Sequence, residues 1–264
     1  MQEASKQMKE ITFEEGKKLM LDTLVSVSDF CERNDIRYSL GYGTLIGAIR
    51  HKGFIPWDDD IDIMMPRDDY ERFVKTYRDG RYAVIDESFN TNHSHIRVSD
   101  EKTVLKLNAW RARFYKAGLW IDVFPIDKVP DSQKGYERFR KWLWFLFEIQ
   151  LTGEAKRKGI VNKVLYALCK PFSRYCGKKA LQEMKRYNDK ETQSVANMGV
   201  WYLHWPKFPL SYMSEFVDVD FEGHKFKAIK EYDSFLRGIY GDYMQFPPKE
   251  KQKPHHNYTA YWKE

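Results

Sequence analysis

Apolar residues recur along this chain first with a helical period and then with a strand period. From residue 13 to residue 34 they return every three or four positions, which predicts a helix. From Ile36 to Leu40 they alternate with polar residues, which predicts a strand. The glycines of "GYGTLIGAIR" then permit a tight turn, and Thr44 is placed to cap the helix that follows.

The stretch "DIDIMM" predicts a second strand that Pro66 ends, with a helix in "RDDYERFVKTY" behind it. From residue 132 to about residue 190 the pattern is mostly helical, and another helix is expected from Ala228 to Tyr240. Further strands are predicted at residues 82–86, 95–98, 103–107, 119–124 and near 216–221.

These elements predict an α+β fold. We expect residues 1–130 to form a core of mixed sheet and helices, and residues 131–264 to form a mostly helical part. The length of 264 residues suits one large domain or two small ones.

Composition favours a cytoplasmic protein. Apolar residues make up 42% of the chain and charged residues 31%, which suits a soluble protein with a sizeable core. No apolar run approaches the roughly 20 residues that span a bilayer, and the first residues lack the apolar core of a signal peptide. The cysteines Cys31, Cys169 and Cys176 lack paired C-x-x-C spacing, so neither a disulfide framework nor a zinc site is indicated.

The net charge of +6 is concentrated in one segment. Between Ala155 and Lys190 there are eleven Lys or Arg and two Asp or Glu, interleaved with apolar residues at near-helical spacing. A basic amphipathic helix of this kind can lie on an anionic membrane surface. The alternative is a helix that faces the core and solvates its basic side. Nucleic acid is not expected as a partner, because no RNA-binding or DNA-binding module accompanies the charge.

An acidic cluster, "WDDDID", stands directly before an apolar strand. Ionised groups that leave water must be paired or bound to metal, so a cation should lie against this strand. Asp60 and Asp62 are two apart on the predicted strand and should leave the same face, about 6.5 Å apart. Two such carboxylates can share Mg²⁺, with Mn²⁺ as the alternative ion. Asp58 could reach the metal by alternation with Asp60 or lie at the entrance of the strand, and Asp59 should point away from the metal, toward solvent or behind the ligands.

The order of strand, Gly-Thr turn, helix, short loop and Asp-x-Asp strand resembles the nucleotidyltransferase fold typified by DNA polymerase β. In that fold the turn and the Asp-x-Asp pair hold phosphates and metal, and a later strand generally supplies a third carboxylate. The resemblance implies that Asp122, in "GLWIDVFPID", is the third acidic residue.

Three longer pieces resemble one family within this fold. They are "GYGTLIGAIRHKGFIPWDDDIDIMMPRDDYERF", "LWIDVFPID" and "YGDYMQFPPKEKQKPHH", and they occur in the order found in the LicD family. Its members transfer phosphocholine to cell-surface glycans, and the eukaryotic relatives fukutin and fukutin-related protein transfer ribitol phosphate. The resemblance reaches from about residue 30 to about residue 257.

This resemblance implies an enzyme that transfers phosphocholine from CDP-choline, or a related CDP-alcohol, to a glycan hydroxyl and releases CMP. The acceptor would be a lipid-linked precursor of teichoic acid, lipopolysaccharide or capsule, met at the inner face of the cell membrane. The implied catalytic residues and metal ligands are Asp60, Asp62 and Asp122, and the implied phosphate-binding turn is Gly43–Thr44.

Other residues near these motifs have two interpretations. Arg50 and Lys52 could hold donor phosphates or belong to a solvated loop. Trp57 and Trp120 could lie over a choline trimethylammonium, since quaternary cations favour aromatic faces, or could belong to the core. The family-like tail is expected to fold back on the core, where Lys251 and Lys253 are candidates for phosphate contact and His255 and His256 follow them. His51 is expected to be structural, and "YGDYM" to end a helix and pack.

Two other functions stay open. A metal-dependent glycosyltransferase also uses Asp-x-Asp with a nucleotide sugar, but it is not expected to carry "GTLIGAIR" just upstream of that motif. A basic module that binds nucleic acid or membrane explains residues 155–190 and leaves the clustered aspartates unexplained.

Overall fold

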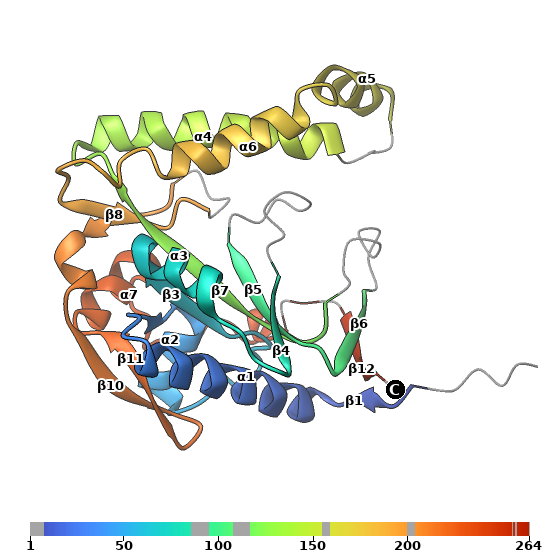
Figure 1. Cartoon of the computed structure of the whole chain (residues 1–264), viewed down its shortest axis with the longest axis vertical. Coiled ribbons are helices and arrows are strands. Elements are labelled where there is room, and N and C mark those ends of the chain that lie inside the picture. Colours follow the sequence, from blue (N-terminus) through green and yellow to red (C-terminus); the bar gives the residue numbers. More distant parts are fainter. Residues whose placement is uncertain are drawn as a thin grey trace, which may run out of the picture.

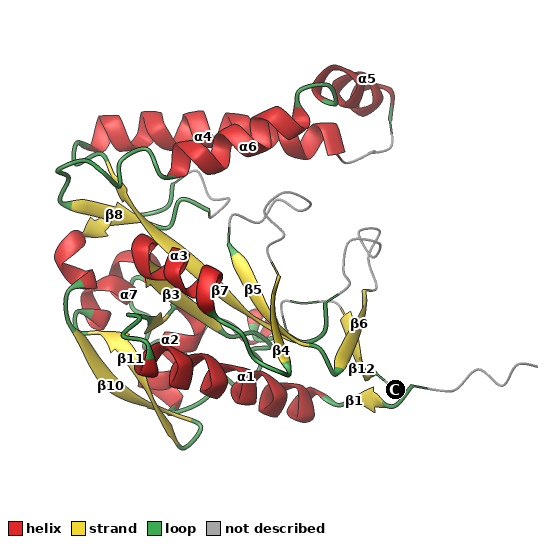
Figure 2. Cartoon of the chain, in the orientation of Figure 1, coloured by secondary structure: helices red, strands yellow, loops and turns green. Residues whose placement is uncertain are grey.

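The chain folds around a mixed sheet of seven strands, shown in Figures 1 and 2. The computed structural model describes residues 8–85, 95–107, 117–154, 159–199, 204–254, 256 and 258–263. The strands run in the order β2-β3-β7-β5-β4, and β8 and β9 continue from the far end of β7. Their bounds are β2 Ser39–Leu40, β3 Asp62–Pro66, β4 Tyr82–Ile85, β5 Ile96–Asp100, β7 Trp120–Val129, β8 Ser194–Ala196 and β9 Phe208–Pro209.

Strand β7 organises this sheet because it is ten residues long and has three partners. Its first half pairs with β3 in parallel and with β5 in antiparallel register, and its second half pairs with β8. Ile121 and Val123 on one face are fully buried, and Trp120 and Asp122 on the other face are buried too, as expected for a strand covered on both faces. The predicted mixed sheet with helices is therefore confirmed.

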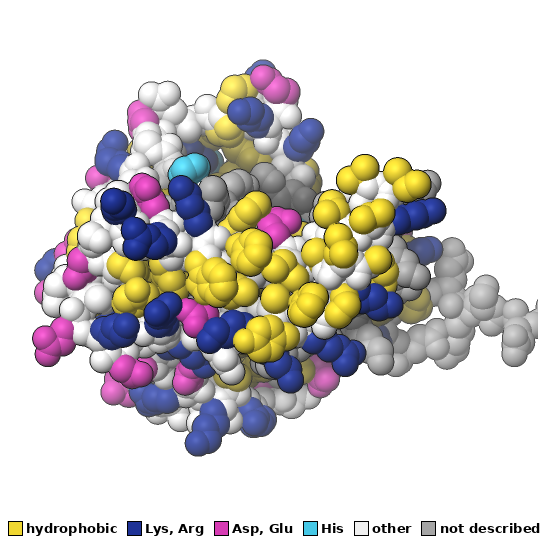
Figure 3. All heavy atoms as spheres, turned by 90° about the horizontal axis from the view of Figure 1, so that it is seen from above, with side chains coloured by type: hydrophobic (Ala, Val, Ile, Leu, Met, Phe, Trp, Pro, Cys, Tyr) yellow, Lys and Arg dark blue, Asp and Glu magenta, His cyan; other side chains and the backbone are white. Residues whose placement is uncertain are grey.

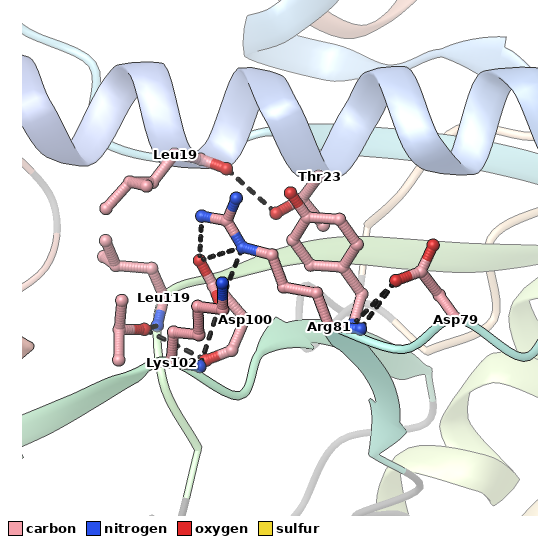
Figure 4. Close-up of polar contacts among 9 residues, drawn as sticks. Leu19, Thr23, Asp79, Arg81, Asp100, Lys102 and Leu119 are labelled. Carbon is pink, nitrogen blue, oxygen red and sulfur yellow. Dashed lines mark hydrogen bonds and ion pairs between the residues drawn. The ribbon is translucent and has the colours of Figure 1, made fainter. Parts of the chain in front are cut away.

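Helices α1 (Phe13–Arg33), α2 (Tyr42–His51) and α3 (Arg67–Thr76) pack against this sheet. A capping box starts α1: Thr12 Oγ1 accepts from the N–H of Glu15, and the Glu15 carboxylate accepts from the N–H of Thr12. Figure 4 shows how the buried Asp100, at the end of β5, is neutralised by Arg81, whose Nη2 donates to it at 2.8 Å.

The predicted helical stretch from residue 132 to about residue 190 contains α4 (Gln133–Glu154), α5 (Ile160–Cys169) and α6 (Ser173–Met184). These helices form a layer apart from the main sheet, at the top of Figure 1. Helices α4 and α6 approach closely at Gly177, where an added Cβ would lie 2.6 Å from Cδ of Gln150. This layer has its own apolar cluster, which runs from Val129 to Met198.

The C-terminal part returns to the sheet. A hairpin of β10 (Phe216–Phe221) and β11 (His224–Ile229) is followed by α7 (Tyr232–Tyr240). The last strand, β12 (Tyr258–Trp262), lies between β1 (Glu10–Ile11) and β6 (Thr103–Leu107). Within the described residues, short 3₁₀ helices span Leu210–Met213 and Lys249–Lys251.

The larger apolar cluster includes residues from Ile11 to Ala260, so both ends of the chain contribute to the core around the sheet. The division at residue 130 stays a prediction. None of the described helices is long and apolar enough to cross a membrane.

Several sequence predictions of local structure were wrong. The strand expected from Ile36 covers only Ser39–Leu40, although Ile36 and Tyr38 are buried in the core. The helix expected from Ala228 begins at Tyr232, because Glu222 and Gly223 (φ 50° and 79°) form a tight turn that folds Ala228 back into β11. The cap of α2 is Gly41 rather than Thr44. Asp60 lies in the loop before β3, not on the strand.

Candidate active site

Three charged residues lie side by side on the central strands. Asp62 is the first residue of β3, and its partner in the parallel register is Asp122 on β7. The partner of Asp122 in the antiparallel register with β5 is Arg97. Asp122, which was expected only to come from a later strand, therefore lies directly beside Asp62 on the neighbouring strand.

The Gly-Thr turn fixes the position of the aspartates. Thr44 is buried at the start of α2, and its Oγ1 accepts a hydrogen bond from the backbone N–H of Asp62 at 2.9 Å. Gly43 contacts the carboxyl of Asp58, and a Cβ at this position would lie 2.9 Å from Asp58 Oδ2. A side chain at position 43 would therefore have to displace the carboxyl group of Asp58.

Residue Tyr42, at the first position of α2, has a φ of 43°, which is unfavourable for a side chain with a Cβ. Its ring packs edge-on against Phe124 and Trp205, and its hydroxyl accepts from the Asn197 side chain at 2.8 Å. Surrounding contacts therefore hold a strained backbone at the edge of the aspartate cluster, a feature that is concentrated at functional sites.

Buried carboxylates elsewhere in the described chain each have a cationic partner. The side-chain pairs are Asp69 with Arg37 and Arg72, Asp100 with Arg81, Asp127 with Arg67, Asp122 with Arg97, and Asp59 with His256. Asp58 is buried as well, and it forms no ion pair with any residue that the structure describes. The half-buried Asp60 and Asp62 likewise have none among the described residues.

The pKa values reflect this lack of cations. Burial, together with the nearby carboxylates of Asp60 and Asp59, raises the pKa of Asp58 to about 8. Burial also raises the pKa of Asp62 well above its usual range, and the charges of Asp60, Asp122 and Asp58 add to that effect. Burial raises the pKa of Asp60 too, although the nearby charge of His256 partly offsets the rise. Without a cation these three groups cannot all be ionised at neutral pH.

The pKa of Asp122 is lowered, in contrast to the raised pKa values of Asp58, Asp60 and Asp62. Burial alone would raise its pKa, but Arg97 and His95 hold the pKa well below its usual range. Its Oδ1 lies 2.9 Å from both Arg97 Nε and His95 Nε2, and its Oδ2 accepts from Trp120 Nε1 at 3.1 Å. The arrangement keeps Asp122 ionised, with both oxygens already engaged in hydrogen bonds.

Asp59 was expected to face solvent or lie behind the ligands, and the structure places it against the C-terminal tail. It is buried, and its two carboxylate oxygens meet the backbone N–H and the Nδ1 of His256 at 3.0 and 3.2 Å. Ligand atoms of Asp59, Asp60 and His256 all lie within 4.8 Å of one another. The neighbouring His255, also of interest from the sequence, lies outside the described residues.

The aspartates open into a pocket of about 870 Å³, a volume within the range of sites for small ligands. One wall comes from the N-terminal half and includes Tyr42, Gly43, Arg50 and Trp57, besides Asp58, Asp60 and Asp62. The other wall comes from residues 204–206 and 239–247 and is rich in aromatic side chains. Its aromatic members are Trp205, Tyr240, Tyr243 and Phe246, with Asp242 as an acidic neighbour.

Of the two expected phosphate-binding cations, one lines this pocket. The Nη1 of Arg50 donates to the carbonyls of Tyr243 and Gln245 at 2.6 and 3.2 Å, and its guanidinium lies 4.6 Å from the centre of the Phe246 ring. Arg50 thus joins the two walls. Lys52 is exposed at the end of α2 and does not line the pocket.

Of the two tryptophans expected to contact choline, Trp57 lines the pocket and Trp120 does not. Trp57 lines the pocket, with its ring centre 6.1 Å from that of Phe246. Trp120 is buried behind the aspartates, and the Arg97 guanidinium lies 4.2 Å from its ring centre. A cation of this chain therefore already covers the Trp120 ring.

The part of the chain that carries the aspartates matches a known protein family. The sequence model of the family described as "LicD/FKTN/FKRP, nucleotidyltransferase domain" matches residues 35–150. The lipopolysaccharide cholinephosphotransferase LicD of Haemophilus influenzae is 33% identical over 284 aligned residues, which cover 96% of this chain and 99% of that protein. The chain belongs to the LicD family.

Shorter matches fall on two uncharacterized rickettsial proteins. The protein of Rickettsia typhi is 40% identical over 68 residues, which are 25% of this chain and 22% of that protein. The protein of Rickettsia prowazekii is 44% identical over 52 residues, which are 20% of this chain and 18% of that protein.

The LicD family match from residue 35 to residue 150 contains every acidic residue of the cluster, but not the second wall of the pocket. Sequence reasoning also missed that wall, because "YGDYM" was expected only to end a helix and pack. It does so: α7 ends at Tyr240, and Tyr243 is buried. The family resemblance of this piece was the available signal that it also lines the site.

Proposed function

We propose that this LicD family member transfers phosphocholine from CDP-choline to a hydroxyl of a lipopolysaccharide or another cell-surface glycan precursor, and releases CMP. The observation that carries the proposal is one pocket that combines an aromatic wall with three carboxyl groups that form no ion pair with any residue the structure describes. The proposal extends to this chain the activity named for its full-length Haemophilus relative. We also infer a nucleotidyltransferase-type core.

A divalent metal ion fits the cluster, because Mg²⁺ prefers carboxylate oxygens and leaves positions for substrate phosphates. Asp60 and Asp62, with Asp58, would hold it, since these carboxyls share the pocket and their raised pKa values mark a missing positive charge. A bound Mg²⁺ would neutralise charge on the diphosphate. An alternative donor set is Asp59, Asp60 and His256.

Asp122 contributes to this proposal in a different way from the sequence-based expectation. Its oxygens already accept from Arg97, His95 and Trp120, so it can serve the metal only by sharing an oxygen with these donors. Its charge beside Asp62 still adds to the negative potential that attracts a cation.

The donor can be placed by its chemistry. Tyr42 and Gly43, which carry the first N–H groups of α2, line the pocket together with Arg50, and both a helix start and an arginine favour a phosphate oxygen. A trimethylammonium group suits the aromatic side chains Trp57, Tyr240 and Phe246 in the same pocket, because quaternary cations are attracted to aromatic faces.

The reaction would form a bond from the acceptor hydroxyl oxygen to the phosphorus that bears choline. The bond from that phosphorus to the oxygen of the CMP phosphate would break, and CMP would leave with the electron pair. The hydroxyl proton would pass to a pocket carboxylate or to solvent. The chain's own residues serve to orient the two substrates and to balance charge.

The test is a product assay with purified protein, Mg²⁺ and a panel of nucleotide donors. Release of CMP from CDP-choline, with choline phosphate found on a glycan acceptor, is the expected result. Release of CMP only from CDP-ribitol would favour the fukutin-like alternative. Release of UDP or GDP from nucleotide sugars would favour a glycosyltransferase and refute the proposal.

A further inference from the structure

Helix α5 turns its apolar side chains toward solvent, whereas a helix of an ordinary soluble protein turns them toward the core. None of its ten residues is buried, and its aliphatic side chains are the most exposed, with Ile160 at 80%, Val161 at 68% and Leu168 at 63%. The half-buried positions are Asn162, Tyr166 and Cys169, which share one face at helical spacing. The face turned toward the protein is thus the more polar one.

The apolar face of α5 continues onto its neighbours. Figure 3 shows hydrophobic side chains gathered over the layer of α4, α5 and α6, with Lys and Arg along the margins. Helix α4 exposes Trp142, Trp144 and Phe145 by 41% to 49%, and the start of α6 exposes Phe172 and Tyr175 by 60% and 67%. Contiguous exposed apolar surface of this kind marks an interaction site on a soluble protein.

The charge around this surface decides which partner it fits. Eight Lys or Arg and two acidic residues lie between residues 159 and 190. Lys163, Lys170 and Lys178 are exposed and form no ion pair within the described part of the chain. Two copies of the chain that met through this surface would bring their cations together and repel one another. An anionic lipid surface instead provides both an apolar interior and opposite charge.

We propose that the surface formed by α5, with the exposed aromatic side chains of α4 and α6, docks on anionic membranes. The aliphatic side chains of α5 would enter the boundary between head groups and acyl chains, as in interfacial amphipathic helices. Exposed tryptophans suit the same boundary because their rings have an apolar body and a polar N–H. The lysines would contact anionic head groups.

The test is sedimentation of the full-length protein with vesicles of phosphatidylcholine alone or of phosphatidylcholine and phosphatidylglycerol. The wild type should bind the anionic vesicles at low salt and be released as salt is raised. The variant Val164→Glu/Leu168→Glu should bind roughly tenfold more weakly or worse, because two charges replace the apolar side chains that enter the bilayer. Each lysine near an anionic surface contributes roughly fivefold in affinity, so Lys163→Gln/Lys170→Gln/Lys178→Gln should also weaken binding strongly.

Matched controls change the same chemistry elsewhere. Lys18→Gln/Lys75→Gln/Lys225→Gln removes three exposed lysines outside the helical layer, and Met244→Glu charges another exposed apolar side chain. Both should bind vesicles like the wild type, and all variants should keep the wild-type melting temperature. Failure of the wild type to bind anionic vesicles at low salt would overturn the proposal. So would a stable dimer that Val164→Glu/Leu168→Glu separates while vesicle binding is absent. The measurement contains no substrate, so its outcome is independent of the proposed transferase activity.

Discussion

His256 holds the side chain of Asp59 through two bonds, from its backbone N–H to Oδ2 at 3.0 Å and between its Nδ1 and Oδ1 at 3.2 Å. The two residues are 197 positions apart in the chain. The tail therefore fixes the loop that carries Asp58 and Asp60, and the geometry of the acidic cluster depends on a residue close to the C-terminus.

The first prediction concerns this contact. Burial would lower the pKa of His256, but the hydrogen bond to Asp59 and the charge of Asp60 raise it above the ordinary 6.5. Because the pKa of His256 is raised by folding, its protonated ring stabilises the folded protein fully below about pH 6.5. This stabilisation is lost as the pH rises through the pKa that His256 has in the folded protein. His256→Ala should therefore lower the free energy of unfolding by about 1 kcal/mol at pH 6 and by less at pH 9.

Urea titrations of wild type and His256→Ala at both pH values measure this difference. His224→Ala, at an exposed position of β11, is the matched control and should change little. An equal loss at pH 6 and pH 9 would show that ionisation of His256 does not contribute.

The second prediction concerns the carboxyls without cations. Because the pKa values of Asp58 and Asp62 are raised in the folded state, the metal-free folded protein binds more protons than the unfolded chain above about pH 4. Its stability should therefore fall from pH 4 toward pH 8, by up to about 1.4 kcal/mol per pH unit for each group. Saturating Mg²⁺ should flatten this slope.

Asp58→Asn should reduce the slope and raise the stability of the metal-free protein at pH 8. Asp29→Asn, at an exposed position of α1, serves as control. Unfolding measured in EDTA and in Mg²⁺ across this pH range tests the idea, and an unchanged slope in Asp58→Asn would contradict it.

The third prediction separates the two possible sets of metal ligands, which share Asp60. If Asp58, Asp60 and Asp62 hold the ion, Asp58→Asn and Asp62→Asn should abolish the rise in melting temperature caused by Mg²⁺. His256→Ala should keep most of that rise. The reverse order would assign the ion to Asp59, Asp60 and His256.

The fourth prediction concerns Arg97, which neutralises Asp122. Arg97→Met leaves a buried carboxylate without its strongest partner and should destabilise the fold by about 3–5 kcal/mol. Arg97→Met combined with Asp122→Asn should recover part of the loss. Guanidinium unfolding of the two variants gives the comparison, and no recovery in the double variant would argue against charge neutralisation as the reason for the contact.

The fifth prediction concerns recognition of choline. Trp57→Leu should weaken binding of CDP-choline by roughly 3-fold to 30-fold, the range of a cation–π contact. Binding of CDP, which lacks the quaternary ammonium, should change much less. Calorimetric titration of both ligands measures the effect, and an equal loss for CDP and CDP-choline would remove Trp57 from the choline subsite.

Residue periodicity predicted much of this fold because the main elements bury one regular face. Such patterns predicted the helix that begins at Phe13, the strands that contain Asp62 and Asp122, and the helices after residue 132. The sequence placed Asp62 and Asp122 on two apolar strands, but the register that sets them side by side came from the structure.

The rest depended on contacts between distant residues. No local pattern shows that His256 reaches Asp59, that Arg97 occupies the face of Trp120, or that Arg50 joins the segment around Tyr243. Each of these pairs is set by tertiary packing. The Lys156, Arg157 and Lys158 part of the basic segment lies outside the described residues, and its contribution to membrane binding stays a prediction.

The two walls of the pocket are made at different times during protein synthesis. The ribosome makes Asp58, Asp60 and Asp62 first, whereas the aromatic wall at residues 239–247 and the contact from His256 follow much later in the chain. A nascent chain that has reached the helical layer thus carries the acidic cluster without a closed site. Transfer activity would begin only once residues 239–256 have left the ribosome and folded back onto the sheet.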